Sequence, residues 1–160
     1  MTRVYVSVGS NEQAGLHVAK ALDEMSTRFA PLDISPVYES VAVGFDGDNF
    51  LNLVVGFDTS LALDELDEEL DRIEQDCGRV RGQHRFSSRT MDLDLLLYGD
   101  LVRHDKKWDI PRREITEYAF VLKPLSQLAP AQLHPELKVS YSHLWESGDF
   151  TDQDLWEVDI

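Results

Sequence analysis

The chain has very little cysteine and no long apolar run, and each absence excludes a class of protein. Cys77 is the one cysteine among 160 residues, so no disulfide can form within the chain. A lone thiol fits a reducing compartment, and we expect a cytoplasmic protein. No stretch approaches the roughly 20 apolar residues of a membrane span. Residues 1–11 also lack the basic and apolar regions of a signal peptide.

Positive charge is scarce as well. The chain has 15 lysines and arginines against 30 aspartates and glutamates, which gives a formal net charge of -15. Nucleic acids and anionic membranes are bound by basic surfaces, so we expect neither as a partner. We expect a monomer that acts on small molecules. The same acidity makes any local cluster of cations conspicuous.

No repeat or low-complexity segment interrupts the chain, and its hydrophobic content of 42% is ordinary for a globular protein. The length predicts one domain over residues 1–160, large enough to bury a core. We expect the core of this domain at about residues 3–130 and a C-terminal extension at about 131–160.

Apolar periodicity predicts alternating strands and helices. Strands are expected at residues 4–8, 33–41, 50–59 and 91–98, and long helices at 13–28 and 60–77, the second capped by Ser60. Shorter helices are expected within 114–128 and at 140–145. The order strand, helix, strand, strand, helix, strand is the βαββαβ order of a ferredoxin-like α+β fold. Such a sheet carries both helices on one face, and we expect the other, open face to form a cleft with the C-terminal third.

Residues 79–98 form the most informative stretch. Its first half, residues 79–89, holds four arginines and no acid. Its second half is a short apolar strand that ends at Gly99, and along it Asp92 and Asp94 point to the same face because side chains alternate. Leu93, Leu95 and Leu97 would point to the opposite face, towards the helices.

Two neighbouring carboxylates repel each other unless water, cations or a metal ion offset the charge. Mg²⁺ prefers a small number of oxygen ligands and completes its shell with water and phosphates. The nearby arginines suit bidentate phosphate contacts, so the two halves together favour phosphoryl-type transfer. The alternative is an exposed Asp-x-Asp paired with arginines in a surface ion-pair cluster.

Other candidates are less specific. Asp46 and Asp48 lie in a glycine-rich loop and are interpreted as turn residues. Asn52 shares a strand face with Phe50, which fits either a binding site or a solvent-facing sheet surface. Cys77 lies on the apolar stripe of its helix and is interpreted as a packed core thiol.

Four motifs together resemble the 6-hydroxymethyl-7,8-dihydropterin pyrophosphokinase family of folate biosynthesis. They are Val8-Gly9-Ser10-Asn11, Phe50-Leu51-Asn52, Gly78-Arg79-Val80-Arg81, and the run from Arg89 to Gly99. The resemblance covers about residues 3–130, and the last motif is the most specific. It implies transfer of the β,γ-diphosphate of ATP to the pterin hydroxymethyl oxygen, with release of AMP.

The resemblance also implies roles for individual residues. Asp92 and Asp94 would hold two Mg²⁺ ions, and Arg79 and Arg89 would act with them in catalysis. ATP would be bound by Glu74, Arg79, Arg81, Arg85, Arg89, Leu95 and Arg112. The pterin would be bound by Ser40, Val41, Val43, Phe50, Asn52, Phe86 and Phe120, with its ring between Phe50 and Phe120.

Two positions depart from the family pattern. Arg112 stands where the family usually has a histidine that contacts ATP phosphates, and Tyr118 stands where an arginine is typical. Arginine keeps a cation near neutral pH, so nucleotide binding would persist with a different geometry. Two alternatives follow: a divergent paralogue with another pterin substrate or weak activity, and a non-catalytic module that binds pterin without metal or ATP.

Overall fold

Most strands of the described chain belong to one sheet of six strands. The computed structural model describes residues 1–41, 47–78 and 91–160. The sheet contains β1 (Thr2–Ser10), β3 (Val37–Ser40), β4 (Phe50–Thr59), β5 (Asp92–Tyr98) and β8 (Leu155–Val158) in the order β5-β1-β4-β3-β8. The short β2 (Asp33–Ile34) also pairs with β4, and every neighbouring pair is antiparallel. The protein is therefore a mixed α/β structure built on an antiparallel sheet.

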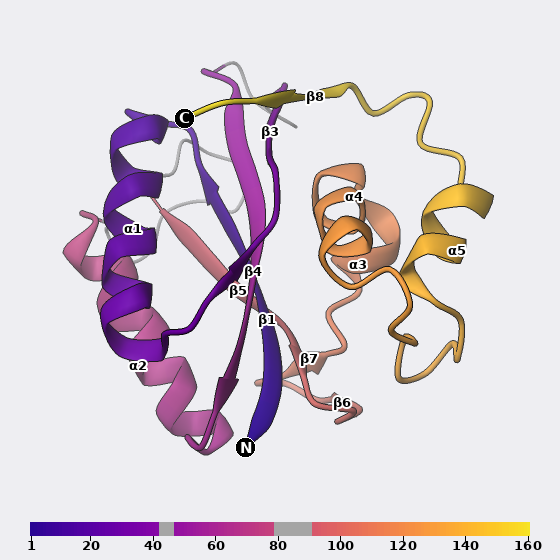
Figure 1. Cartoon of the computed structure of the whole chain (residues 1–160), viewed down its shortest axis with the longest axis horizontal. Helices are drawn as coiled ribbons and strands as arrows, with labels where there is room; N and C mark the ends of the chain where they lie inside the picture. The colour runs from indigo at the N-terminus through magenta and orange to yellow at the C-terminus, as the bar shows by residue number, and fades with distance from the viewer. Residues whose placement is uncertain (42–46, 79–90) are drawn as a thin grey trace.

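Two helices cover one face of this sheet, as the sequence predicts. These are α1 (Ala14–Phe29) and α2 (Leu63–Asp76), seen together on one side of the strands in Figure 1. Their apolar stripes pack against alternate residues of β1, β4 and β5, which form the larger hydrophobic cluster. Val6, Leu53 and Ile73 are fully buried there. Burial of these aliphatic side chains supplies much of the drive to fold.

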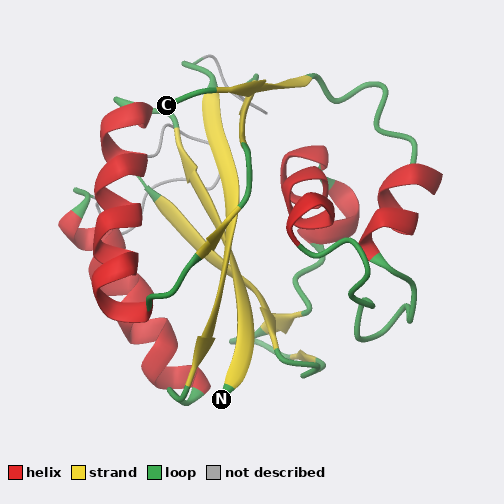
Figure 2. Cartoon of the chain, viewed as in Figure 1, coloured by secondary structure: helices red, strands yellow, loops and turns green. Residues whose placement is uncertain are grey.

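The opposite face is partly closed by the C-terminal third of the chain. It carries α3 (Glu114–Glu117), α4 (Ala119–Leu128) and α5 (Tyr141–Ser147), which lie across the sheet from α1 and α2 (Figure 2). A second cluster joins Tyr5, Val54 and Leu96 of the sheet to Val121 and Leu125 of α4. The C-terminal third thus covers part of this face, as expected, and the face is apolar where α4 packs on it.

A β-bulge in β5 makes one prediction wrong. Tyr5 pairs with Leu97 and Val6 pairs with Leu95, so Leu96 is an extra residue in its strand. A bulge breaks the alternation of side chains. Leu93 and Leu95 face α1 and α2 as expected, but Leu97 packs with Leu96 in the second cluster.

Two smaller differences have local causes, and one further segment forms a hairpin. The expected strand at 33–41 is divided at Pro36, which cannot donate to a ladder. The second long helix begins at Leu63 rather than after Ser60, and the Glu65 carboxylate accepts from the Ala62 amide at 2.9 Å. The segment 101–110 forms a hairpin of β6 (Arg103–His104) and β7 (Asp109–Ile110).

None of the helices in the described part of the chain combines the length and hydrophobicity that a bilayer span requires.

Candidate active site

The two carboxylates of the Asp-x-Asp motif lie on the sheet face that α4 covers, at the end where the second cluster gives way to polar residues. Asp92 and Asp94 are both partly exposed, and Leu93 between them is buried against the helices. Asp94 is the cross-strand partner of Ser7 on β1. The alternation predicted for this part of β5 is therefore confirmed, since it precedes the bulge.

A cross-strand row connects the carboxylates to the proposed pterin residues. Tyr38 pairs with Asn52, Asn52 pairs with Gly9, and Gly9 pairs with Asp92, so all four positions share one face of the sheet. Neighbouring strands are about 4.8 Å apart, which puts the Asn52 and Asp92 backbones roughly 10 Å apart with Gly9 between them. Gly9 has no side chain, so nothing projects from the sheet in the middle of this row. A β-carbon at Gly9 would lie 3.1 Å from the Asn52 Oδ1 atom.

The Asn52 end of this row is fixed by hydrogen bonds. Asn52 is buried, and its Nδ2 donates to the Ser40 hydroxyl at 3.0 Å. The Tyr38 hydroxyl donates to Gln127 Oε1 of α4 at 2.5 Å, and the Lys123 ammonium lies 5.2 Å from the Tyr38 ring centre. Asn52 is therefore not on a solvent-facing surface, and α4 is tied to the sheet beside it. The sequence analysis did not single out Tyr38 and included Gly9 only as part of the motif Val8-Gly9-Ser10-Asn11; the strand register places both residues in this row.

Glu74, one of the predicted nucleotide ligands, belongs to α2 and contacts β5 from the helix side of the sheet. Glu74 is 5% exposed, and its Oε2 accepts a hydrogen bond from the Leu93 amide at 2.8 Å. This contact joins α2 to the residue between the two aspartates. Leu95, another predicted nucleotide ligand, is buried among the helices, so its side chain lies on the face opposite Asp94.

Arg112 lies next to the carboxylate pair. Its terminal nitrogen is 3.7 Å from Asp94 Oδ1, and its Nε donates to the Glu114 carboxylate. Partial burial by itself lowers the pKa of Arg112, but the charges of Asp94 and Glu114 outweigh it and raise that pKa. The alternative that the Asp-x-Asp motif pairs with arginines is thus confirmed for one contact, between Asp94 and Arg112. Glu114 was not found from the sequence.

The aromatic candidates lie on different elements. Phe50 begins β4 and Phe120 belongs to α4; both are half-buried. The Phe120 ring stacks on Tyr118, with ring centres 5.0 Å apart and an interplanar angle of 16°. Tyr118 thus packs directly against Phe120. Val41 is exposed at the end of β3.

Several predicted site residues lie outside the described residues. They are Val43, Arg79, Arg81, Arg85, Phe86 and Arg89. The cleft predicted on this face stays a prediction.

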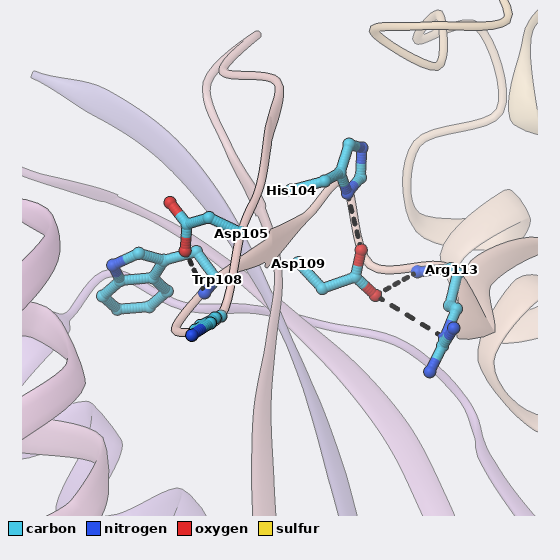
Figure 3. Close-up of a pocket in the computed structure, with 6 residues that line it drawn as sticks. His104, Asp105, Trp108, Asp109 and Arg113 are labelled. Carbon is cyan, nitrogen blue, oxygen red and sulfur yellow. Dashed lines mark hydrogen bonds and ion pairs between the residues drawn. The ribbon is translucent and has the colours of Figure 1, made fainter.

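One open cavity of about 500 Å³ lies on the β6–β7 hairpin, and neither aspartate of the Asp-x-Asp motif lines it. Figure 3 shows His104 and Arg113 both directed at Asp109. His104 Nδ1 is 2.7 Å from Asp109 Oδ1, and its Nε2 is 2.6 Å from Glu136 Oε1. These hydrogen bonds, to Glu136 and to Asp109, raise the pKa of His104. Four of its lining residues, His104, Asp105, Asp109 and Arg113, are engaged in ion pairs, so we assign no catalytic role to them.

Cys77 is confirmed as a core thiol. It is 2% exposed, and burial raises its pKa to about 11, so the nucleophilic thiolate is disfavoured at neutral pH.

Comparison with known proteins identifies the family. Residues 5–130 match the family described as 7,8-dihydro-6-hydroxymethylpterin-pyrophosphokinase (HPPK). The chain belongs to this family. It is 34% identical over 137 residues to the 2-amino-4-hydroxy-6-hydroxymethyldihydropteridine pyrophosphokinase of Aquifex aeolicus, covering 84% of this chain and 85% of that one. The corresponding enzyme of Pseudomonas aeruginosa is 40% identical over 136 residues, covering 80% and 81%.

The fold is also similar to that of a solved structure. The crystal structure of Plasmodium falciparum HPPK-DHPS superposes with a TM-score of 0.67 at 12% identity. The match covers 91% of this chain but 43% of that longer chain, so it concerns the fold alone. Family membership makes the protein an ATP-dependent pyrophosphokinase of folate biosynthesis, as the resemblance implied.

Proposed function

We propose that the chain transfers diphosphate from ATP to 6-hydroxymethyl-7,8-dihydropterin at the face that carries Asp92, Asp94 and Asn52. The observation that carries this assignment is the row from Tyr38 through Asn52 and Gly9 to Asp92. It supports a pterin held at one end and phosphates held at the other, with Gly9 leaving room for the reacting atoms between them.

The donor set at the carboxylate end fits Mg²⁺. Asp92 and Asp94 supply hard oxygen atoms from alternate positions of one strand, and both side chains are partly exposed. Within the described ranges, no three His, Cys, Asp or Glu side chains form a metal-binding group. Mg²⁺ commonly uses one or two carboxylates together with water and substrate phosphates. Bound there, Mg²⁺ would neutralise phosphate charge, and the family resemblance implies two such ions.

The remaining roles are assigned to residues around these two ends. Phe50 and Phe120 would stack on the pterin ring while Asn52 and Ser40 bond its edge. Arg112 would contact the triphosphate, as would Arg79, Arg81, Arg85 and Arg89. Orientation and charge neutralisation would account for most of the rate, because an alcohol attacks phosphorus without a strong base.

We also propose that the core belongs to the ferredoxin-like class. The support is the strand order β5-β1-β4-β3 with both long helices on one face. In this arrangement β8 of the C-terminal extension adds a fifth strand at the β3 edge. A monomer in the cytoplasm stays our expectation, and sedimentation would test the oligomeric state.

The test measures AMP formation from ATP, Mg²⁺ and 6-hydroxymethyl-7,8-dihydropterin. We expect pterin-dependent AMP with the wild type, and a loss of about three orders of magnitude in Asp94→Ala because a metal ligand contributes about 4 kcal/mol of transition-state stabilisation. Asp100→Ala is the matched control, since it removes an exposed carboxylate from the turn after the same strand.

Circular dichroism and thermal melting would check that both variants fold. An Asp94→Ala variant with an unaltered rate would remove the metal-site assignment. Pterin binding without any AMP would instead favour the non-catalytic module.

A further inference from the structure

Three charged side chains form a continuous chain that ends at the proposed metal site. Glu114, at the start of α3, accepts from Arg112 Nε, and an Arg112 terminal nitrogen lies 3.7 Å from Asp94 Oδ1. The Glu114 side chain is 13% exposed, whereas those of Arg112 and Asp94 are 32% and 40% exposed. Glu114, the most buried of the three, therefore holds the guanidinium at Nε, and this leaves a terminal nitrogen of the guanidinium next to Asp94.

The backbone of Arg112 is fixed on both sides. Its amide donates to the Leu96 carbonyl at 3.0 Å, and its carbonyl accepts from the Ile115 amide at 3.1 Å. Leu96 is the extra residue of the β5 bulge, two positions after Asp94, and Ile115 is fully buried. The hydrogen bond to Leu96 thus holds the Arg112 backbone against β5 near Asp94, and the hydrogen bond to Glu114 restricts rotation of the Arg112 side chain.

A cation in this position acts differently on a free divalent metal ion and on a divalent metal ion bound to a triphosphate. Arginine cannot lose its proton in proteins, so it always opposes a free metal ion that approaches Asp94. A metal that arrives with a triphosphate brings negative charge, and the guanidinium fork matches phosphate oxygens. Arg112 can then exchange its carboxylate partner for a phosphate partner.

We propose that Glu114 is a positioning residue that orients Arg112 at Asp94, so that the site favours metal bound to nucleotide over free metal. This inference rests on the proposed function for the roles of Asp94 and ATP. It adds a residue, Glu114, and a preference for the metal–nucleotide complex as the form that binds.

Two binding measurements that need no turnover test it. The dissociation constant of free Mn²⁺ is obtained by electron paramagnetic resonance, and that of the Mn²⁺ complex of a β,γ-methylene ATP analogue by calorimetry. In Arg112→Gln we expect free Mn²⁺ to bind about threefold more tightly, since an opposing charge is lost. The nucleotide complex should bind about tenfold more weakly, since a charged hydrogen bond is lost.

Glu114→Gln tests the positioning role. By itself it should weaken binding of the nucleotide complex about threefold. In the Arg112→Gln background it should change nothing further, because Glu114 acts through Arg112. Glu117→Gln is the matched control: it removes a carboxylate from the same helix, at an exposed residue whose backbone carbonyl accepts from Gln153. It should leave both constants unchanged.

The outcomes separate this inference from the function on which it rests. A Glu114→Gln effect that persists in the Arg112→Gln background would overturn the inference alone. Unchanged constants in Arg112→Gln would overturn the inference together with the triphosphate contact proposed for Arg112, but not the metal site at Asp92 and Asp94. Mn²⁺ binding that is insensitive to Asp94→Ala in the presence of the analogue would overturn the proposed metal site. If Arg112→Gln does not fold, Arg112→Lys replaces it, since lysine lacks the Nε fork and should also abolish the Glu114→Gln effect.

Discussion

The two faces of the sheet are built from the same strands but differ in composition. The face under α1 and α2 is apolar, with Val4, Val6 and Val8 alternating on β1 and Phe57 on β4. The other face is apolar where α4 packs on Leu96 and Leu97, and polar where Ser7, Asp94 and Asn52 lie. The apolar face supplies much of the free energy of folding. This offsets the free-energy cost of placing carboxylates and a buried amide on the other face.

The first and largest prediction compares two adjacent residues that point to opposite faces. Leu53 is fully buried under the helices, and Leu53→Ala should lower the free energy of unfolding by about 3 kcal/mol, because it removes apolar contacts and leaves a cavity. Its Michaelis constants should not change below the melting transition. Urea titration and steady-state kinetics would measure the two effects.

Asn52→Ala should show the reverse pattern. It removes one buried hydrogen bond, worth about 1 kcal/mol of stability, but should raise the KM for pterin about tenfold. An Asn52→Ala variant with normal pterin KM, or a Leu53→Ala variant with a specific loss of pterin binding, would contradict the division between the faces.

The second prediction concerns Gly9 in the middle of the polar row. In Gly9→Ala the new methyl group would lie 3.1 Å from Asn52 Oδ1 and would project into the space between Asn52 and Asp92. We expect pterin affinity to fall about tenfold, with a stability loss of about 1 kcal/mol from overpacking. Isothermal titration with the pterin and thermal melting would separate these effects. Equal losses in Ser7→Ala would show that the effect is not particular to this row.

The third and smallest prediction concerns His104, outside both faces. Asp109 and Glu136 bind its two ring nitrogens, and Asp105, Lys106 and Arg113 line the same cavity. The pKa of His104 is raised by the hydrogen bonds to Glu136 and Asp109, so its contribution to stability is fully present below its unfolded pKa of about 6.5. This contribution is lost as pH rises through the higher folded pKa.

The melting temperature of the wild type minus that of His104→Gln should therefore decrease between pH 6 and pH 8, by no more than about 2 °C because the group is exposed. Melting curves across this pH range would measure it. A difference that grows with pH would refute the assignment. His143→Gln is a control on the exposed surface of α5.

The local sequence pattern was sufficient to predict an element wherever burial of one apolar face determines it. The periods of 3.6 and 2 located α1, β4, α2 and the start of β5, because burial of a single apolar face decides each of them. The alternation of Asp92, Leu93 and Asp94 was predictable for the same reason. The family motifs then indicated the chemistry, and the match over residues 5–130 confirmed the family.

Tertiary structure alone decided the features that depend on partners distant in the chain. The bulge at Leu96 arises from pairing with β1, and it turned Leu97 to the face opposite the one predicted. Arg112 meets Asp94 because the chain after β7 returns to β5, which no local pattern encodes. The row of Tyr38, Asn52, Gly9 and Asp92 likewise exists only through strand register, since side-chain types specify faces but pairing specifies neighbours.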